Sequence, residues 1–120
     1  MNVPVLLIED DLLLVKMYSA KFKAEGIPLA VASDGEMGLR DIIEKKPSVV
    51  ILDVMMPKLS GIEVLKRLQE SGSVNPKIVV MSNLMNEKEK VEALGLGASE
   101  YLMKTEVTPG ELVEKIRKYL

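Results

Sequence analysis

The chain has 120 residues, of which 16 are Lys or Arg and 18 are Asp or Glu, with no His, Cys or Trp. The length predicts one domain, and the missing His and Cys exclude an imidazole base, a thiol nucleophile and a zinc–thiolate site. Any chemistry must therefore use carboxylates, hydroxyls, lysines and an oxygen-ligated metal, and the net charge of −2 argues against direct nucleic-acid binding.

The first residues, Met1–Pro4, lack the basic start of a signal peptide. No window of the chain approaches the roughly 18 consecutive apolar residues of a membrane span. We therefore expect a cytoplasmic protein without a membrane segment, and the absence of Cys agrees with that compartment.

Five short apolar runs follow one another along the chain: Val3–Ile8, Leu29–Ala32, Val49–Leu52, Ile78–Met81 and Tyr101–Met103. Most are rich in Val, Ile and Leu and do not alternate with polar residues. This pattern is typical of strands that are buried on both faces of a parallel sheet.

Amphipathic stretches of helical periodicity separate these runs. Four of the stretches begin with a capping residue placed three residues before a Glu: Ser33–Glu36, Ser60–Glu63, Asn86–Glu89 and Thr108–Glu111. Strands and helices thus alternate about five times. The alternation predicts a single doubly wound α/β sandwich, with helices on both faces of a five-stranded parallel sheet.

Chemically active side chains follow directly after four of the predicted strands. Glu9, Asp10 and Asp11 follow the first strand, Asp53 the third, Ser82 the fourth and Lys104 the fifth. In this fold class, ligands bind beyond the carboxyl ends of the strands. Carboxylates gathered there repel one another, and Mg²⁺ relieves that repulsion while binding phosphate oxygens. The arrangement predicts a phosphoryl site with an aspartate nucleophile.

Each of these residues, taken alone, has a plain structural explanation. Asp10 and Asp11 could cap the first helix, and Asp53 could be an ordinary residue between strand and loop. Ser82 could be a turn residue and Lys104 a solvated lysine. Their joint occurrence after successive buried strands favours the functional interpretation.

At these residues the sequence resembles the receiver domain of two-component response regulators. The matching segments, in order, are Leu7–Asp11, Val50–Pro57 with the following Gly61, Val79–Ser82 and Gly97–Lys104. The resemblance covers the whole chain. It implies a flavodoxin-like sheet with strand order 2-1-3-4-5, and one receiver domain over residues 1–120 with no effector domain in these residues.

The resemblance also implies a role for each residue of the metal and acceptor site. Asp53 would accept a phosphoryl group from the phosphohistidine of a sensor histidine kinase or phosphotransfer protein. Asp11, Asp53 and the backbone carbonyl of Met55 would ligate Mg²⁺, and Asp10 would act through a metal-bound water. The protein would then be a phosphoacceptor that catalyses only its own phosphotransfer and autodephosphorylation.

The remaining site residues would form the switch. Lys104 would pair with the phosphoryl oxygens, Ser82 would swing towards them, and Tyr101 would change rotamer in step. Asn83 stands where the family has a small residue and could restrict access to the phosphoryl group or bond to it. The surface of the fourth helix, fifth strand and fifth helix would change and bind a downstream protein. The same surface could mediate a homodimer, although nothing specific in the sequence points to one.

Three other functions compete with this one. A receiver-like interaction module that phosphate does not switch has no reason to keep the acids, the hydroxyl and the lysine. A Mg²⁺-dependent phosphatase or phosphotransferase of the haloacid dehalogenase type needs a second Asp where this chain has Met55. A flavodoxin-type cofactor binder needs a Ser/Thr/Gly-rich phosphate loop where this chain has Glu9–Asp11.

Overall fold

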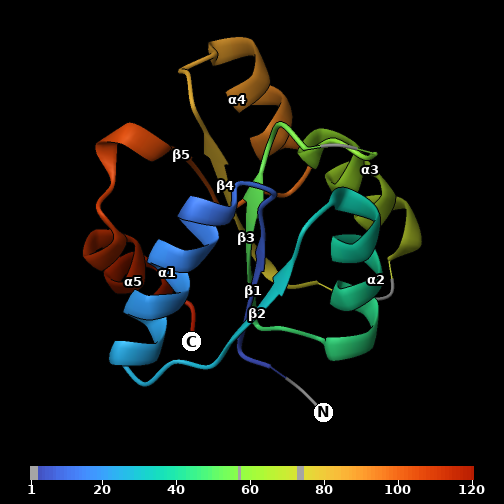
Figure 1. Cartoon of the computed structure of the whole chain (residues 1–120). Coiled ribbons are helices and arrows are strands. Elements are labelled where there is room, and N and C mark those ends of the chain that lie inside the picture. Colours follow the sequence, from blue (N-terminus) through green and yellow to red (C-terminus); the bar gives the residue numbers. More distant parts are fainter. Residues whose placement is uncertain (1–2, 57, 73–74) are drawn as a thin grey trace.

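The structure is a computed structural model that describes residues 3–56, 58–72 and 75–120. Its strands are β1 (Val5–Ile8), β2 (Leu29–Ala32), β3 (Val49–Asp53), β4 (Lys77–Ser82) and β5 (Glu100–Met103). They form one parallel sheet in the order β2-β1-β3-β4-β5 (Figure 1). The predicted fold class and strand order are confirmed.

Five α-helices alternate with the strands in the described residues: α1 (Leu12–Ala24), α2 (Gly35–Lys45), α3 (Gly61–Ser71), α4 (Glu87–Gly95) and α5 (Pro109–Arg117). A short 3₁₀ helix, η1 (Lys104–Glu106), joins β5 to α5. Helices α1 and α5 cover one face of the sheet, and α2, α3 and α4 cover the other (Figure 1). None of the helices among the described residues has the length and apolarity needed to cross a bilayer.

The core explains why the strands carry no polar alternation. In β1, Leu6 and Ile8 pack on the α2–α4 side, whereas Val5 and Leu7 pack on the α1–α5 side. Successive side chains of a strand point to opposite faces, so a sheet covered on both faces needs an apolar residue at every position. All four residues of β1 are almost completely buried.

Helix starts follow the predicted capping residues with one exception. Ser60, Asn86 and Thr108 each cap a helix by accepting a hydrogen bond from the backbone N–H three residues on. The prediction of Ser33 as the cap of α2 is wrong. Asp34 caps this helix and accepts from a backbone N–H of the first turn at 2.8 Å, because its carboxylate lies one residue closer to the helix.

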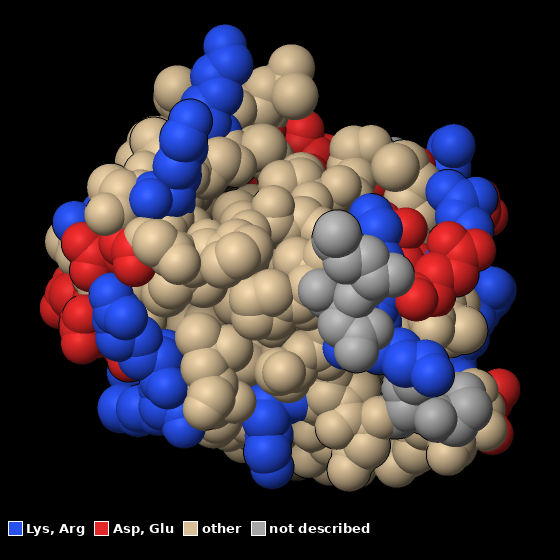
Figure 2. Space-filling view, turned by 90° about the horizontal axis from the view of Figure 1, so that it is seen from below, with Lys and Arg blue, Asp and Glu red and all other residues tan. Residues whose placement is uncertain are grey.

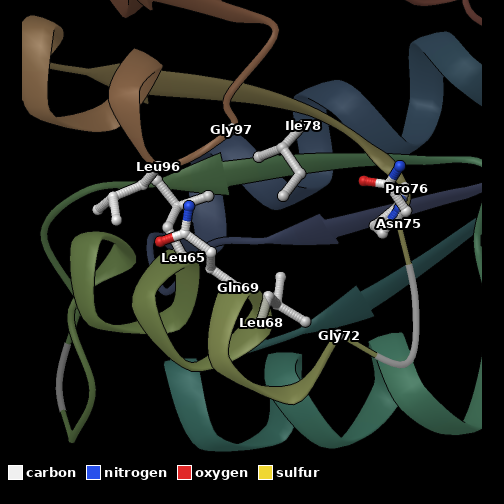
Figure 3. Close-up of a pocket in the computed structure, with 9 residues that line it drawn as sticks. All are labelled: Leu65, Leu68, Gln69, Gly72, Asn75, Pro76, Ile78, Leu96 and Gly97. Carbon is white, nitrogen blue, oxygen red and sulfur yellow. The ribbon is translucent and has the colours of Figure 1, made fainter.

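The end of the molecule at the amino ends of the strands carries a groove but no acidic cluster among the described residues. Figure 2 shows this end, where uncharged residues fill the centre and charged residues of both signs surround them. The groove has a volume of about 370 Å³ and lies between α3 and the turn after α4 (Figure 3). Its floor is apolar, with Leu68 of α3 and Ile78 of β4. The predicted chemistry lies at the other end of the sheet.

Candidate functional site

The carboxyl ends of β1, β3, β4 and β5 lie along one edge of the sheet. Ile8 of β1 pairs with Leu52 of β3, so the next residues, Glu9 and Asp53, lie at the same level at the carboxyl ends of neighbouring strands. Asp53 is the last residue of β3 and Ser82 the last of β4, so each belongs to its strand rather than to the loop after it. Strand ends are rigid positions, and they hold these side chains in place.

A buried lysine stands between two buried carboxylates at this edge. The Lys104 Nζ lies 2.7 Å from Glu9 Oε1 and 3.3 Å from Asp53 Oδ1. The Lys104 side chain is 7% exposed, and those of Glu9 and Asp53 are 2% and 6% exposed. Buried charges need partners, and here two negative charges share one positive charge. The site is therefore short of positive charge.

The ionisation of Asp53 reflects that shortage. Burial raises the pKa of Asp53 and the nearby Glu9 carboxylate raises it further, to about 7, against the opposing effect of Lys104. Burial alone would lower the pKa of Lys104, but its hydrogen bond to Glu9 and the charge of Asp53 raise it. A cation bound beside Asp53 would favour the ionised, nucleophilic form of this carboxylate.

Three acidic residues could hold such a cation. Glu9, Asp10 and Asp53 each offer a carboxylate oxygen, and these atoms all lie within 4.8 Å of one another. Asp10 is exposed, whereas Glu9 and Asp53 are buried, so the cluster faces solvent on one side. Oxygen donors with access to water suit Mg²⁺, which commonly keeps several of its own water ligands.

Asp11 lies outside this cluster, although the sequence analysis named it as a direct metal ligand. Its carboxylate caps α1 and accepts hydrogen bonds from the backbone N–H groups of Leu13 (2.9 Å) and Leu14 (3.3 Å). The helix begins directly after residue 11, and its free N–H groups take this side chain. The structure brings Glu9 to the cluster instead, a residue that the sequence analysis noted at the strand end but gave no role.

The β3–α3 loop holds Met55 next to Asp53. The Met55 backbone N–H donates to Asp53 Oδ1 at 3.3 Å, and Met55 is 74% exposed. Two glycines fix the loop. A Cβ on Gly61 would collide with the Asp53 carbonyl oxygen, and a Cβ on Gly35 would collide with Leu59. Pro57, which belongs to the predicted motif, lies outside the described residues.

The predicted switch residues meet at the β4–α4 loop. Ser82 Oγ donates to the Leu84 carbonyl at 2.8 Å, so the hydroxyl is bonded to its own loop. Tyr101 is 7% exposed, and its hydroxyl lies 2.6 Å from Glu89 Oε1 and 3.5 Å from the Leu84 carbonyl. Burial raises the pKa of Tyr101, and the hydrogen bond to Glu89 adds to this effect. Asn83 is exposed.

Comparison with known proteins identifies the class to which this fold and site belong. The family model described as the response regulator receiver domain matches residues 5–117. The chain belongs to this family, and it is a receiver domain of the two-component response regulators.

Individual relatives agree with that assignment. The chain is 34% identical, over its whole length, to 49% of PhoP, the alkaline phosphatase synthesis transcriptional regulatory protein of Bacillus subtilis. It is 35% identical, over 97% of its length, to 48% of the transcriptional regulatory protein CpxR of Escherichia coli. The chain thus spans about half the length of the curated relatives it matches.

A solved structure supports the fold. The receiver domain of the Francisella response regulator 1452 superposes with a TM-score of 0.89 at 32% identity, covering 98% of this chain and 96% of that one. The class is that of a signalling protein rather than a metabolic enzyme.

Proposed function

We propose that this receiver domain is a phosphorylation switch whose acceptor is Asp53. One observation carries the proposal: a buried carboxylate lies 3.3 Å from a buried lysine ammonium and within 4.8 Å of the oxygens of two further acids. A nucleophile between an anion-binding cation and a metal-binding acidic cluster is the arrangement that phosphoryl transfer requires.

The groups that would ligate Mg²⁺ are the carboxylates of Asp10 and Asp53 and the backbone carbonyl of Met55. Glu9 would act from within the cluster through a metal-bound water, because its carboxylate is engaged with Lys104. When bound, Mg²⁺ supplies positive charge beside the phosphoryl oxygens. This ligand set replaces Asp11 with Asp10 in the direct role, since Asp11 caps α1.

The chain's own groups account for the remaining chemistry. An ionised Asp53 oxygen attacks the phosphorus of the donor phosphohistidine, and the P–N bond breaks with its electron pair leaving on the imidazole. Lys104 pairs with the charge that develops on the phosphoryl oxygens, from a position it already holds. Water later attacks the acyl phosphate and returns Asp53 to its free form, so the protein acts on itself alone.

The structural response begins at Ser82. Phosphorylation adds roughly −1.5 to −2 charge and three strong acceptor oxygens. The Ser82 hydroxyl now bonds to the Leu84 carbonyl, and it can turn to a phosphoryl oxygen at the neighbouring strand end. Tyr101 contacts the same loop, so its packing changes with that of Ser82. The outcome is a population shift between two packings of one fold.

The partners follow from this chemistry. We propose that the donor is a sensor histidine kinase or a phosphotransfer protein, and that a downstream protein reads the surface of α4, β5 and α5. A homodimer formed through that surface remains a prediction. A cytoplasmic location is likewise a prediction. With a net charge of −2, this domain is not expected to bind nucleic acid itself.

The test is the intact mass of the full chain after incubation with a small phosphodonor and Mg²⁺. One added phosphoryl group is expected in the wild type and in Asp41→Asn, whose buried carboxyl lies on α2 away from the site. The gain should vanish in Asp53→Asn and in the presence of a chelator. If the folded wild type gains no phosphoryl group from the small phosphodonor and none from a phosphorylated histidine kinase, the chain is an unswitched interaction module and the proposal is wrong.

A further inference from the structure

A hydrogen bond between Tyr101 and Glu89 joins the sheet to α4. The Tyr101 hydroxyl on β5 donates to Glu89 Oε1 in the first turn of α4 at 2.6 Å. Helix α4, whose residues are all described, buries Ala93 but leaves Val91 and Leu94 exposed. A helix with so little buried surface depends on individual contacts for its position, and this short bond to a carboxylate is among the stronger kinds.

Two hydroxyls share one acceptor beside this bond. The Leu84 carbonyl accepts from Ser82 Oγ at 2.8 Å, and the Tyr101 hydroxyl lies 3.5 Å from the same oxygen. The longer contact is at the limit of a hydrogen bond, since O–H···O distances are commonly 2.5–3.0 Å. Tyr101 therefore bonds mainly to Glu89 while Ser82 occupies the Leu84 carbonyl.

Glu89 also borders the proposed phosphorylation site. It lines a hollow of about 480 Å³ together with Asp10 and Met55, and Val54 and Ile62 supply apolar walls. Charges near a protein surface interact more strongly than charges in bulk water. Negative charge added at the acceptor will therefore act on the Glu89 carboxylate.

We propose that Glu89 is a positioning residue that holds α4 in its unphosphorylated arrangement and releases it when Asp53 is phosphorylated. This inference rests on the proposed function. As Ser82 turns to the phosphoryl group, the Leu84 carbonyl becomes free to accept from Tyr101. The added charge repels Glu89 at the same time, so Tyr101 exchanges Glu89 for Leu84. The exchange moves no proton between groups and breaks no covalent bond.

The proposal fixes the direction in which a substitution at Glu89 acts. A bond present only in the unphosphorylated arrangement stabilises that arrangement, so weakening it favours the phosphorylated one. Glu89→Gln keeps the shape and an acceptor oxygen but removes the charge, and neutral hydrogen bonds are roughly half as strong as charged ones. We expect Glu89→Gln to bind a phosphoryl mimic about fivefold more tightly than the wild type.

The experiment uses the full chain labelled with 3-fluorotyrosine and titrated with beryllofluoride at a fixed Mg²⁺ concentration. Fluorine NMR follows the Tyr101 signal, which Tyr101→Phe identifies. Glu87→Gln is the matched control, since Glu87 lies in the same first turn of α4 and is exposed. Of the two glutamine variants, only Glu89→Gln should bind the mimic more tightly than the wild type does. Its free Tyr101 signal should lie partway towards the mimic-bound position of the wild type.

A double variant separates the Tyr101 bond from other effects of Glu89. In Tyr101→Phe the donor is absent, so adding Glu89→Gln should bring a clearly smaller gain in mimic affinity than it brings in the wild type, with only the part due to charge repulsion left. The inference fails if the wild type binds beryllofluoride but Glu89→Gln binds it equally or more weakly, or if its Tyr101 signal does not move. If the wild type binds no beryllofluoride in the presence of Mg²⁺, the proposed function itself fails, and this inference with it.

Discussion

Asp53 should make the protein less stable as the pH rises from 5 to 8. Burial and the neighbouring Glu9 raise the pKa of Asp53 from its ordinary value of 3.8 to about 7. Between those two values the folded protein keeps a proton on Asp53 that the unfolded chain has lost. Because the folded state then binds more protons, its stability falls as the pH rises through this window.

The size of this effect follows from the two pKa values. Because the unfolded chain loses its Asp53 proton at a lower pH than the folded protein does, the free energy of unfolding falls by roughly 2–3 kcal/mol between pH 5 and pH 8. The Asp53 side chain is only 6% exposed, so solvent screens little of this effect. Asp53→Asn carries a neutral amide of similar size, so it lacks the loss of stability that comes from ionising Asp53. The variant should therefore gain roughly 2–3 kcal/mol in free energy of unfolding relative to the wild type across the same range.

Urea unfolding followed by far-ultraviolet circular dichroism at several pH values, with a chelator present, measures this difference. Titrating groups that do not contact Asp53 act equally on both proteins, so the difference between the two curves reports on Asp53 together with its neighbours Glu9 and Lys104. A difference that stays constant from pH 5 to pH 8 would refute the raised pKa of Asp53. Adding Mg²⁺ at pH 8 should restore stability to the wild type, because a ligand of the folded state stabilises it, and should do so far less in Asp53→Asn.

Two further predictions test the ligand set and the loop. Asp11→Ala should lower the free energy of unfolding by about 1 kcal/mol through the lost cap, without changing the Mg²⁺ concentration for half-maximal phosphorylation. Asp10→Ala should raise that concentration about tenfold or more, and the reverse outcome would restore Asp11 as the direct ligand. Gly35→Ala should destabilise by about 1–3 kcal/mol and also raise the Mg²⁺ requirement, because its Cβ would displace Leu59 and the loop. Gly95→Ala, whose Cβ meets nothing within 4 Å, should leave that requirement unchanged.

The fold was predictable because its signals are local and repeated. Each buried strand is a continuous apolar run, since helices cover both faces of the sheet. The ends of strands were harder to place. The first apolar run begins at Val3 but β1 begins at Val5, because Pro4 has no N–H to donate to the sheet. Asp53 and Ser82 lie within β3 and β4 rather than after them, because the ladder continues through these polar residues.

The site was predictable in its residue types but not in every position. Three consecutive acids, Glu9, Asp10 and Asp11, leave open which one caps the helix and which ones reach the neighbouring strand. The answer depends on the residue at which α1 begins, and a shift of one residue exchanges the roles. Glu89 was recognisable only as a residue three after the cap Asn86. Its bond to Tyr101 joins residues 12 positions apart and needs the packing of α4 on β5.

The site has a rigid half, formed by Asp53 and Lys104 at the strand ends, and a lightly packed half, formed by the β4–α4 loop. Asp53 ends the central strand β3 and Lys104 directly follows the edge strand β5, and both side chains are almost fully buried, which suits a reaction that needs fixed distances. The β4–α4 loop is packed far more lightly: Leu84 is 75% exposed, and its carbonyl accepts hydrogen bonds from Ser82 and Tyr101. A chemical event at the rigid half can change those few bonds without disturbing the core, because small local free energies suffice to move a lightly packed segment. The response should therefore appear as faster amide hydrogen exchange in α4 when a phosphoryl mimic binds, while exchange in β1 and β3 becomes no faster.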